Sequence, residues 1–381
     1  MTSVGVVGGG QLAQMLHQAA IGLGVRVVVL DPDPECSAAL AGAARVDGTW
    51  TSRHDLLAFA RSGVDVVTFD HELADPDDLA ALQDEAPVPV RPAASTKLFA
   101  QDKLHQRSAL MRDGVPVPAF RAVATADDVE AFGAQHGWPV VVKTARGGYD
   151  GRGVWMCDDL DTARVVVEEV GGGLLVEERV DLDHELAVMV ARRPSGQARA
   201  WPALRTTQVG GICTEVLLGA GGETPHAAAA AALALDLAGR IGLEGVMAVE
   251  LFAAGDGRLL VNELACRPHN SGHVTMDACT TGQFEQHLRA VLDLPLGDPA
   301  PVTGAAVMVN VLGGPQPWDH AGLADALGVD GATVHLYGKR HRPGRKLGHV
   351  NAVAGMVDEA RRRALRAAEA LGTPAGAASG P

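Results

Sequence analysis

The sequence predicts an α/β protein, α+β overall, whose N-terminal part is a doubly wound, Rossmann-like domain. Apolar strands and amphipathic helices alternate over residues 1–95, which is typical of a mostly parallel sheet with helices on both faces. From residue 138 the pattern changes to strands separated by turns. A length of 381 residues exceeds one typical domain and indicates two or three.

The N-terminal domain is expected at residues 1–95. Its strands are the apolar runs 4–7, 25–31 and 64–70, and the first of its helices is expected at 11–23. The proline-rich stretch that follows the domain marks the first boundary.

Residues that cap helices mark three further helix starts. Ser52 precedes one helix, and Asp75, followed by a proline, precedes another. Thr125 with Asp128 three residues later resembles a capping box, and Gly137 should end that helix.

A central domain is expected at residues 96–298, with a lid subdomain at about 121–185. It opens with one helix that carries both Lys97 and Lys103. Its predicted strands are 139–143, 153–157, 173–180, 185–193 and the segment 198–207, and its later helices are 226–241 and 283–292. Three apolar residues of the last helix share one face: Phe284, Leu288 and Val291.

A smaller C-terminal domain is expected at residues 299–370. It contains apolar strands at 305–313 and 333–339. The small-residue segment 371–381 is expected to be a disordered tail.

Composition excludes several classes of function. The formal charge of −14 argues against a nucleic-acid partner, because binding to phosphate backbones needs positive surface. The five cysteines have no C-x-x-C spacing, which argues against zinc and favours a reducing, cytoplasmic location. No secretory leader and no membrane-spanning apolar run is recognisable.

The region after residue 245 predicts a β-hairpin. The dipeptide Asp256-Gly257 favours a two-residue loop, so Gly255 should pair with Arg258. Counting outward along both strands brings two carboxylates, from residues 250 and 263, to facing positions.

Facing carboxylates repel each other, so the pair Glu250 and Glu263 indicates a cation site. Mg²⁺ suits it, because this ion prefers one or two carboxylates together with substrate phosphates. The alternative is a surface hairpin with solvated glutamates. A dense polar run beyond the second strand, with Arg267, His269 and Asn270, favours the site.

Two glycine-rich turns are candidates for phosphate binding. Residues 8–13 fit G-x-G-x-x-A between a strand and a helix, and Asp31 ends the next strand, as in dinucleotide-binding enzymes. The alternatives are a turn that needs glycine only for close packing, and a helix N-terminus whose free N–H groups bind another phosphate or polar ligand. Lys143 ends a strand and leads into the loop GGYDGRGV, which suits phosphate binding by backbone N–H groups, although Asp150-Gly151 also fits an ordinary hairpin.

Two further segments have a functional and an ordinary interpretation. Glu177 and Glu185 flank an acidic loop that either meets adenine and ribose or is simply solvated. The segment 337–349 carries Lys339, Arg342, Arg345 and Lys346, which either bind a phosphomonoester or form a charged surface loop. No G-x-S-x-G, H-E-x-x-H or H-R-D pattern supports the commonest hydrolases and kinases.

Together these motifs closely resemble the N5-carboxyaminoimidazole ribonucleotide synthase family, ATP-grasp enzymes of purine biosynthesis. The resemblance runs from residue 4 to about 351 and rests on the segments GGGQL, VVK…GGYDGRGV, VEERVD…E, ELF…VNELACRPHNSGH, QFEQHLRAVLDLPLG and HLYGK…RPGRKLGH. It implies the ATP-grasp fold, with a pre-ATP-grasp domain, an ATP-grasp domain with its lid, and a small C-terminal domain. It also implies carboxylation of 5-aminoimidazole ribonucleotide by bicarbonate and ATP through carboxyphosphate, in a cytoplasmic homodimer.

The resemblance implies roles for individual residues. ATP would be bound by Lys103, Lys143, Gly148, Tyr149, Asp150, Gly151, Arg152, Gly153, Val154, Glu177, Glu178, Arg179, Val180, Glu185, Gln208, Asn262 and Glu263. Mg²⁺, or alternatively Mn²⁺, would be held by Glu250 and Glu263. The reacting groups would be met by Arg267, His269, Asn270, Tyr149 and Asp150. The ribonucleotide would be bound by Gln11, Leu12, Glu72, Lys339, Arg345 and Lys346.

The chain departs from the usual family pattern at Ala13, Gln14, Gln208, Gly210, Thr214 and Cys266. Two alternatives within the class of nucleotide-binding proteins are another ATP-grasp ligase, such as formate-dependent glycinamide ribonucleotide formyltransferase, and an inactive regulator. An alternative from another class is a Rossmann oxidoreductase that uses the turn 8–13. That enzyme would leave the paired glutamates and both downstream loops without a role.

Overall fold

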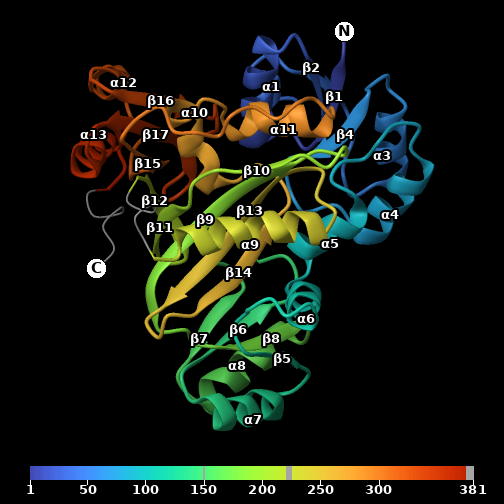
Figure 1. The fold of residues 1–381 in the computed structure, drawn as a ribbon, viewed down its shortest axis with the longest axis vertical. Coiled ribbons are helices and arrows are strands. Elements are labelled where there is room, and N and C mark those ends of the chain that lie inside the picture. The colour runs from blue at the N-terminus through green and yellow to red at the C-terminus, as the bar shows by residue number, and fades with distance from the viewer. Residues whose placement is uncertain (149–150, 220–224, 375–381) are drawn as a thin grey trace.

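The computed structural model describes residues 1–148, 151–219 and 225–374, and it contains three β-sheets (Figure 1). A four-stranded sheet lies in the blue N-terminal region at the top of Figure 1, and a second four-stranded sheet lies in the green region at the bottom. A nine-stranded sheet connects them and continues into the red C-terminal region. The predicted fold class is therefore confirmed.

The N-terminal sheet is parallel, in the order β3-β2-β1-β4. Its strands are β1 (Ser3–Val7), β2 (Arg26–Leu30), β3 (Ala44–Val46) and β4 (Val66–Phe69), and its helices are α1 (Gln11–Gly22), α2 (Ser37–Leu40), α3 (Arg53–Ala60) and α4 (Pro76–Glu85). Ser52 and Asp75 cap α3 and α4 by accepting backbone N–H groups, as predicted. The short elements α2 and β3 were not predicted, because neither is long enough to show a period.

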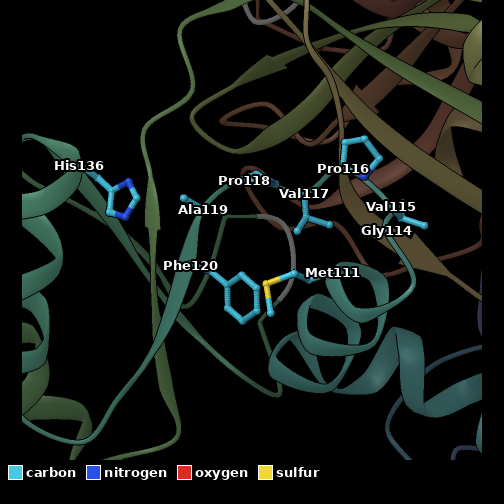
Figure 2. A pocket seen from close by; sticks show the side chains of 9 residues that line it. All are labelled: Met111, Gly114, Val115, Pro116, Val117, Pro118, Ala119, Phe120 and His136. Atoms are coloured by element: carbon cyan, nitrogen blue, oxygen red, sulfur yellow. The ribbon is translucent and has the colours of Figure 1, made fainter.

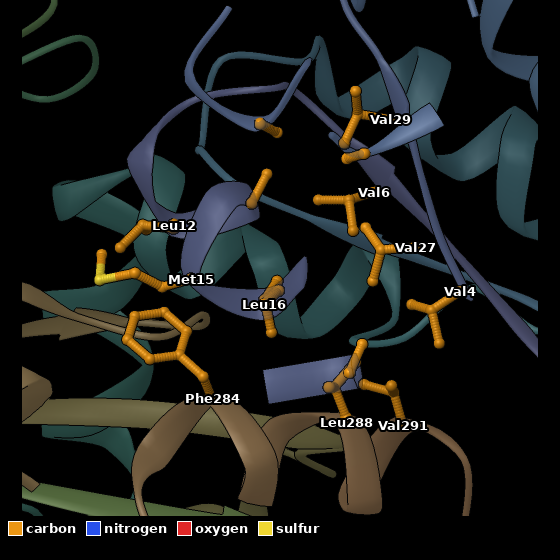
Figure 3. Close-up of a cluster of buried hydrophobic side chains, with 14 of the residues drawn as sticks. Val4, Val6, Leu12, Met15, Leu16, Val27, Val29, Phe284, Leu288 and Val291 are labelled. Carbon is orange, nitrogen blue, oxygen red and sulfur yellow. The ribbon is translucent and has the colours of Figure 1, made fainter. Parts of the chain in front are cut away.

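The N-terminal sheet is tied to the central part through an apolar core (Figure 3). Helix α11 (Gln283–Val291) turns the predicted face toward α1 and the strands behind it. The contact joins Phe284, Leu288 and Val291 to Leu12, Met15, Leu16, Val4, Val6, Val27 and Val29. The two regions therefore share one hydrophobic core.

The helix expected to carry both Lys97 and Lys103 is two helices, so that prediction was wrong. Helix α5 (Ala94–Gln101) ends where Asp102 leaves the helical conformation, and α6 (Lys103–Arg112) begins next to it. The Asp102 carboxylate caps α6 by accepting the His105 N–H at 2.9 Å. The break lets the two lysines point to different parts of the site.

The lid sheet is antiparallel, in the order β5-β8-β6-β7. Its strands are β5 (Phe120–Val123), β6 (Val140–Thr144), β7 (Val154–Cys157) and β8 (Leu174–Glu178), and its helices are α7 (Ala126–His136) and α8 (Leu160–Val170). The capping box of Thr125 and Asp128 is present, and Gly137 ends α7 with a φ of 89°. Helix α8, capped by Asp159, was not predicted.

The large sheet has the order β14-β13-β9-β11-β12-β15-β17-β16, with β10 paired to β9. Its strands are β9 (Leu182–Arg192), β10 (Ala198–Ala200), β11 (Leu204–Val209), β12 (Ile212–Leu218), β13 (Gly245–Ala254), β14 (Leu259–Ala265), β15 (Ala305–Leu312), β16 (Ala332–Leu336) and β17 (Lys346–Ala354). The remaining elements are α9 (Ala227–Arg240), the 3-10 helix η2 (Asn270–Val274), α10 (Thr275–Ala278), α12 (His320–Leu327) and α13 (Val357–Ala370). The segment expected as the C-terminal domain thus contributes three strands to the sheet of the central domain.

The hairpin β13–β14 has the predicted partners but not the predicted turn. Ala254 pairs with Arg258, at an N···O distance of 2.9 Å, so the loop has three residues and the predicted pairing of Gly255 with Arg258 was wrong. A β-bulge next to Glu250 shifts the register back by one residue, which brings Glu250 opposite Glu263. Two deviations of one residue therefore cancel, and the predicted carboxylate pair is confirmed.

The C-terminal end is packed further than expected. Leu371 is completely buried, and the Thr373 hydroxyl accepts the Leu312 N–H at 3.2 Å. The prediction of a disordered tail from residue 371 was therefore wrong at its start. Residues 375–381 of that segment lie outside the described part. No helix among the described residues is long and apolar enough to cross a membrane.

Candidate active site

The carboxylates of the predicted metal site share one face of the large sheet. Helix α9 covers the other face, where it packs against Val249 and Leu251 of β13 and against Leu186 of β9. Side chains alternate along a strand, so Glu250 and Glu185 point away from α9. The two acidic strands therefore present their carboxylates to the same side.

The β-bulge adds two side chains to this face. Val261 and Leu264 of β14 both belong to the core under α9, although a regular strand would turn residues three apart to opposite faces. The extra residue is accommodated by turning both Asn262 and Glu263 toward the carboxylate face. This face thus collects Glu185, Glu250, Asn262 and Glu263.

The electrostatic environment distinguishes the two facing glutamates. Burial, then repulsion by Glu263 and Glu185, raises the pKa of Glu250 to about 8. Burial also opposes the ionisation of Glu263, but the Lys103 ammonium, 2.9 Å from its Oε1, outweighs it and holds the pKa below its usual value. The site therefore carries one neutralised and one uncompensated carboxylate.

Glu185 is the third acid of the face. Burial raises its pKa to about 7, against a hydrogen bond from Gln208. Gln208 follows a register shift in β11, which differs from the regular alternation of a strand. The structure therefore brings together Glu185 and Gln208, which were both predicted to bind ATP.

Glu177 lies behind the site, in a buried ion triad. It is 2 % exposed, and its carboxylate is bonded to the Lys143 ammonium at 2.6 Å and to Nε of Arg107 at 2.7 Å. Burial opposes ionisation, but these two cations lower the pKa of Glu177 to about 2. The carboxylate expected to meet adenine or ribose is thus committed to two cations of the protein.

The glycine loop that follows Lys143 and β6 contacts the large sheet. The loop packs against the turn between β11 and β12: a Cβ built on Gly211 would lie 2.6 Å from the Cα of Gly151. Gly153 has a φ of 72°, and a Cβ there would lie 2.5 Å from the Thr144 hydroxyl. Gly148 is part of the described loop, whereas Tyr149 and Asp150 lie outside the described residues.

A basic cavity of about 380 Å³ lies between four distant parts of the chain. It is lined by Gln11 at the start of α1, Arg152 of the glycine loop, Ile212, Lys339, Arg342, Pro343, Gly344, Arg345 and Lys346. The Lys339 ammonium donates to the Gln11 side chain at 2.6 Å. Burial, then the neighbouring Arg342, lowers the pKa of Arg345. The structure thus brings together four of the six residues predicted to bind a ribonucleotide.

Arg267 and Glu72 lie in contact at the end of the N-terminal sheet. Nε of Arg267 is 3.5 Å from the Glu72 carboxylate, whose other oxygen pairs with the buried Lys97. His269 approaches Glu250 to 3.6 Å, so the polar run after β14 reaches the carboxylate face. Asn270 begins η2 immediately beyond it.

The glycine turn 8–13 does not present a dinucleotide site. The Gly9 N–H donates to the Asp31 carboxylate at 2.7 Å, and the Gly10 N–H donates to Asp70. A Cβ on Gly9 would lie 2.4 Å from Sγ of Cys36. Close packing therefore explains the glycines, and Asp31 closes the turn instead of facing a ribose.

Five other predicted residues differ in how far their side chains are exposed or already bonded. Leu12, which was predicted to bind the ribonucleotide, is 5 % exposed and packs in the core around α1. Its side chain is therefore not available to a ligand. Val180 packs with Ala254 and Leu260, and Glu178 accepts the Ala119 N–H. Val154 and Arg179 are exposed.

Three charged residues at the site had not been predicted. Arg107 and Lys97 are completely buried cations, and Asp70 lies beside Arg267 and Lys339. Burial, then attraction by Arg267, leaves Asp70 with a pKa raised to about 6. The spacing of Lys103 and Arg107, one helical turn apart, was the available indication.

A second cavity, of about 450 Å³, lies between α6 and the lid (Figure 2). Its lining is mostly apolar and comprises Met111, Gly114, Val115, Pro116, Val117, Pro118, Ala119, Phe120 and His136. None of the residues predicted for the site lines it. Among the described residues, no group of three or more His, Cys, Asp or Glu side chains could hold a metal by itself.

Comparison with protein families divides the chain into three matched regions. The ribonucleotide synthetase preATP-grasp domain matches residues 1–101, and the ATP-grasp domain matches residues 108–284. The phosphoribosylaminoimidazole carboxylase C-terminal domain matches residues 306–363. The three matches follow the order of the three regions expected from the sequence.

Individual proteins match over nearly the whole chain. The N5-carboxyaminoimidazole ribonucleotide synthase of Mycobacterium tuberculosis is 47% identical, over 97% of this chain and 87% of the relative. The crystal structure of the synthetase of that name from Thermus thermophilus has a TM-score of 0.87 at 34% identity, covering 97% of this chain and 99% of that one. The Aspergillus clavatus enzyme, in complex with ADP and 5-aminoimidazole ribonucleotide, has a TM-score of 0.89 at 30% identity, covering 97% and 98%.

Proposed function

The chain belongs to the N5-carboxyaminoimidazole ribonucleotide synthases, ATP-grasp ligases of purine biosynthesis, and we propose that it performs their reaction. Bicarbonate would attack the γ-phosphorus of ATP, which releases ADP and forms carboxyphosphate. The amine of 5-aminoimidazole ribonucleotide would then take up the carboxyl group with release of phosphate. One observation carries this proposal: the basic cavity joins Arg152 of the glycine loop to Gln11 and to the C-terminal cations.

The basic cavity fits the phosphate of a ribonucleotide. It combines lysines and arginines with one neutral amide, and arginine suits bidentate contact with a phosphate. A ligand held there would lie next to the glycine loop, so its reactive end could meet a group formed on ATP. In the proposed complex, Gln11, Lys339, Arg345 and Lys346 bind the sugar and phosphate, and Glu72 lies near the base.

The ATP phosphates would lie between the lid and the carboxylate face. Lys103 and Lys143, which pair with Glu263 and Glu177 in the protein alone, would turn to the phosphates. Gly148, Gly151 and Gly153 allow the loop to approach the phosphates closely. Glu185 with Gln208 would hold the ribose, and the segment 178–180 the adenine, through its backbone. Glu177 would act from behind, by holding Lys143.

The donor set fits a magnesium ion that is shared with phosphates. Glu250 and Glu263 face each other and offer only oxygen donors. The two carboxylates repel each other, and a divalent cation between them would remove this repulsion. We propose that these two carboxylates, with Asn262 beside them, hold Mg²⁺, or Mn²⁺ in its place. When bound, the ion neutralises charge on the transferred phosphoryl group.

The reacting groups would be oriented by the polar run after β14. Arg267 carries the positive charge that bicarbonate and carboxyphosphate require, and its contact with Glu72 fixes its direction. His269 and Asn270 would lie beside it, and Tyr149 and Asp150 would face the amine. Water must be kept from the labile acyl phosphate, which is the expected role of the lid. We further propose a homodimer that works in the cytoplasm.

Phosphate release from MgATP tests the substrate assignment. We expect release to rise when both bicarbonate and 5-aminoimidazole ribonucleotide are added, and to stay low when glycinamide ribonucleotide and formate replace them. No stimulation by 5-aminoimidazole ribonucleotide would reject the assignment. Stimulation by glycinamide ribonucleotide and formate would favour the other ATP-grasp ligase.

A further inference from the structure

Among the described residues, Arg107 is the largest completely buried charged side chain, and the proposed reaction leaves it without a role. It lies on α6 one turn beyond Lys103, and it is completely buried. Its Nε donates to Oε1 of Glu177 at 2.7 Å, and its Nη1 donates to the Gln106 side chain at 2.8 Å. Gln106 is held in turn by the Phe99 carbonyl, at 2.7 Å. The guanidinium plane is therefore fixed on two sides.

The third nitrogen of this guanidinium has unused bonding capacity. Nη2 of Arg107 is buried and has no hydrogen-bond partner among the described residues. Nε and Nη2 together form the edge that binds a carboxylate through two parallel hydrogen bonds. Here only the Nε half of that pair is made, because the Lys143 ammonium takes Oε2 of Glu177 at 2.6 Å.

The same chain contains the complete form of this pair. Arg361 of α13 binds Glu215 of β12 through Nε, at 2.8 Å, and through Nη2, at 3.0 Å. Glu215 is 3 % exposed, so its carboxylate is also buried, whereas the Arg361 side chain is 38% exposed. The difference between the two arginines is the lysine that competes for the second carboxylate oxygen.

The Lys143 ammonium has three donors, but turning to a phosphate of ATP would draw it away from Oε2 of Glu177, which it contacts at 2.6 Å. If it turns to the nucleotide, Oε2 of a buried carboxylate loses its partner, and an uncompensated buried charge is strongly unfavourable. Nucleotide binding at Lys143 is therefore more favourable when another group takes over this oxygen. Arg107 is already attached to the same carboxylate, with one donor unused.

We propose that Arg107 is a positioning residue for nucleotide binding: its Nη2 takes over Oε2 of Glu177 when Lys143 turns to an ATP phosphate. The inference rests on the proposed role of Lys143 in ATP binding. Glu177 thus has two states, shared between the two cations without nucleotide and held by Arg107 alone with nucleotide. The arginine makes Lys143 available without leaving a buried charge.

Titration calorimetry with MgADP, supported by the KM for MgATP, tests this in the full chain. We expect Arg107→Gln to weaken MgADP binding about tenfold or more, because Glu177 then retains Lys143. Arg107→Lys keeps a cation but lacks the two-donor edge, so it should recover only part of the affinity. The double variant Arg107→Gln/Glu177→Gln removes the charge that retains Lys143, so it should bind MgADP more tightly than Arg107→Gln alone.

Arg361→Gln is the matched control, since it breaks the complete pair away from the nucleotide and should leave MgADP affinity unchanged. Losses that simply add in the double variant, or an Arg107→Gln protein that is less stable but binds MgADP normally, would overturn the inference. Lys143→Ala separates this failure from failure of the proposed function. If Lys143→Ala itself binds MgADP normally, the proposed role of Lys143 in ATP binding is wrong. If Lys143→Ala binds MgADP weakly but Arg107→Gln binds it normally, only the proposed role of Arg107 is wrong.

Discussion

Glu250 and Glu263 face each other across β13 and β14, yet their pKa values are shifted in opposite directions. Lys103 compensates Glu263, at 2.9 Å, whereas Glu250 lies 3.6 Å from the His269 ring, which is charged only when it is protonated. The facing pair is thus kept at high electrostatic cost in the protein alone. Such a cost is expected where a cation and phosphates are bound.

The first prediction concerns the compensated partner of that pair. Glu263→Gln should abolish turnover, with a fall of at least about 100-fold, because it removes a metal carboxylate and releases Lys103. Phosphate release measures the effect, and circular dichroism checks the fold. Glu285→Gln, in the α11 surface pair with Arg289, is the control and should keep its activity. Near-normal turnover of Glu263→Gln would contradict the metal role.

The second prediction follows from the pKa of Glu250, which is about 8 in the folded chain against an ordinary value of 4.5. The folded protein binds this proton more tightly than the unfolded chain, so its stabilising effect is complete below about pH 4.5 and is lost as the pH rises through 8. Glu250→Gln should therefore melt at least about 2 °C higher than the parent at pH 8.5, and the two should converge at pH 5.

Melting curves without metal and nucleotide measure this difference. The variant should also fail in turnover, so that stability and activity change in opposite directions. An equal or lower melting temperature of Glu250→Gln at pH 8.5 would show that the charge at this position is not uncompensated.

The third prediction concerns the basic cavity. Lys339→Ala and Arg345→Ala should each raise the KM for 5-aminoimidazole ribonucleotide about tenfold or more, because each removes a cation from the proposed phosphate site. The KM for ATP should change little. Arg340→Ala is the control, since this side chain is 87% exposed and pairs with Glu35 outside the cavity. Equal effects on both substrates would argue against a ribonucleotide site.

The fourth prediction concerns the contact between the glycine loop and the turn after β11. Gly211→Ala places a methyl group 2.6 Å from the Cα of Gly151, so it should lower kcat/KM for ATP about tenfold by displacing the loop. Gly242→Ala is the control: its φ is also positive, at 64°, but nothing lies within 4 Å of the added atom. It shares the backbone strain without the clash. Equal activities of the two variants would exclude a role for this contact.

The fifth prediction concerns the core between α1 and α11. Leu288 is completely buried, so Leu288→Ala should lower the free energy of unfolding by about 2–5 kcal/mol. Urea denaturation measures the loss. Leu294→Ala, at a position 40% exposed, should change it by no more than about 0.5 kcal/mol. A small effect of Leu288→Ala would mean that this core does not stabilise the joined regions.

Elements with a clear period or cap were predictable from the chain alone. Helix α7 begins and ends at its capping residues because Thr125, Asp128 and Gly137 act on their own neighbours. The apolar face of α11 was predictable for the same reason, since its period of 3.6 residues lies within ten positions. Asp102 was missed as a break because a single cap inside a helical pattern is ambiguous until Arg146 and the loop after β6 pack against it.

The sequence by itself determined the two strands of the hairpin and their acidic residues, because alternation is local, although the loop between them is one residue longer than predicted. Only the tertiary structure decided the bulge beside Glu250, since Val261 and Leu264 both have to pack under α9. It also decided the pairing of Arg107 with Glu177, which lie 70 residues apart. Burial makes charge pairing obligatory, and which partner a buried charge finds depends on contacts that no local pattern records.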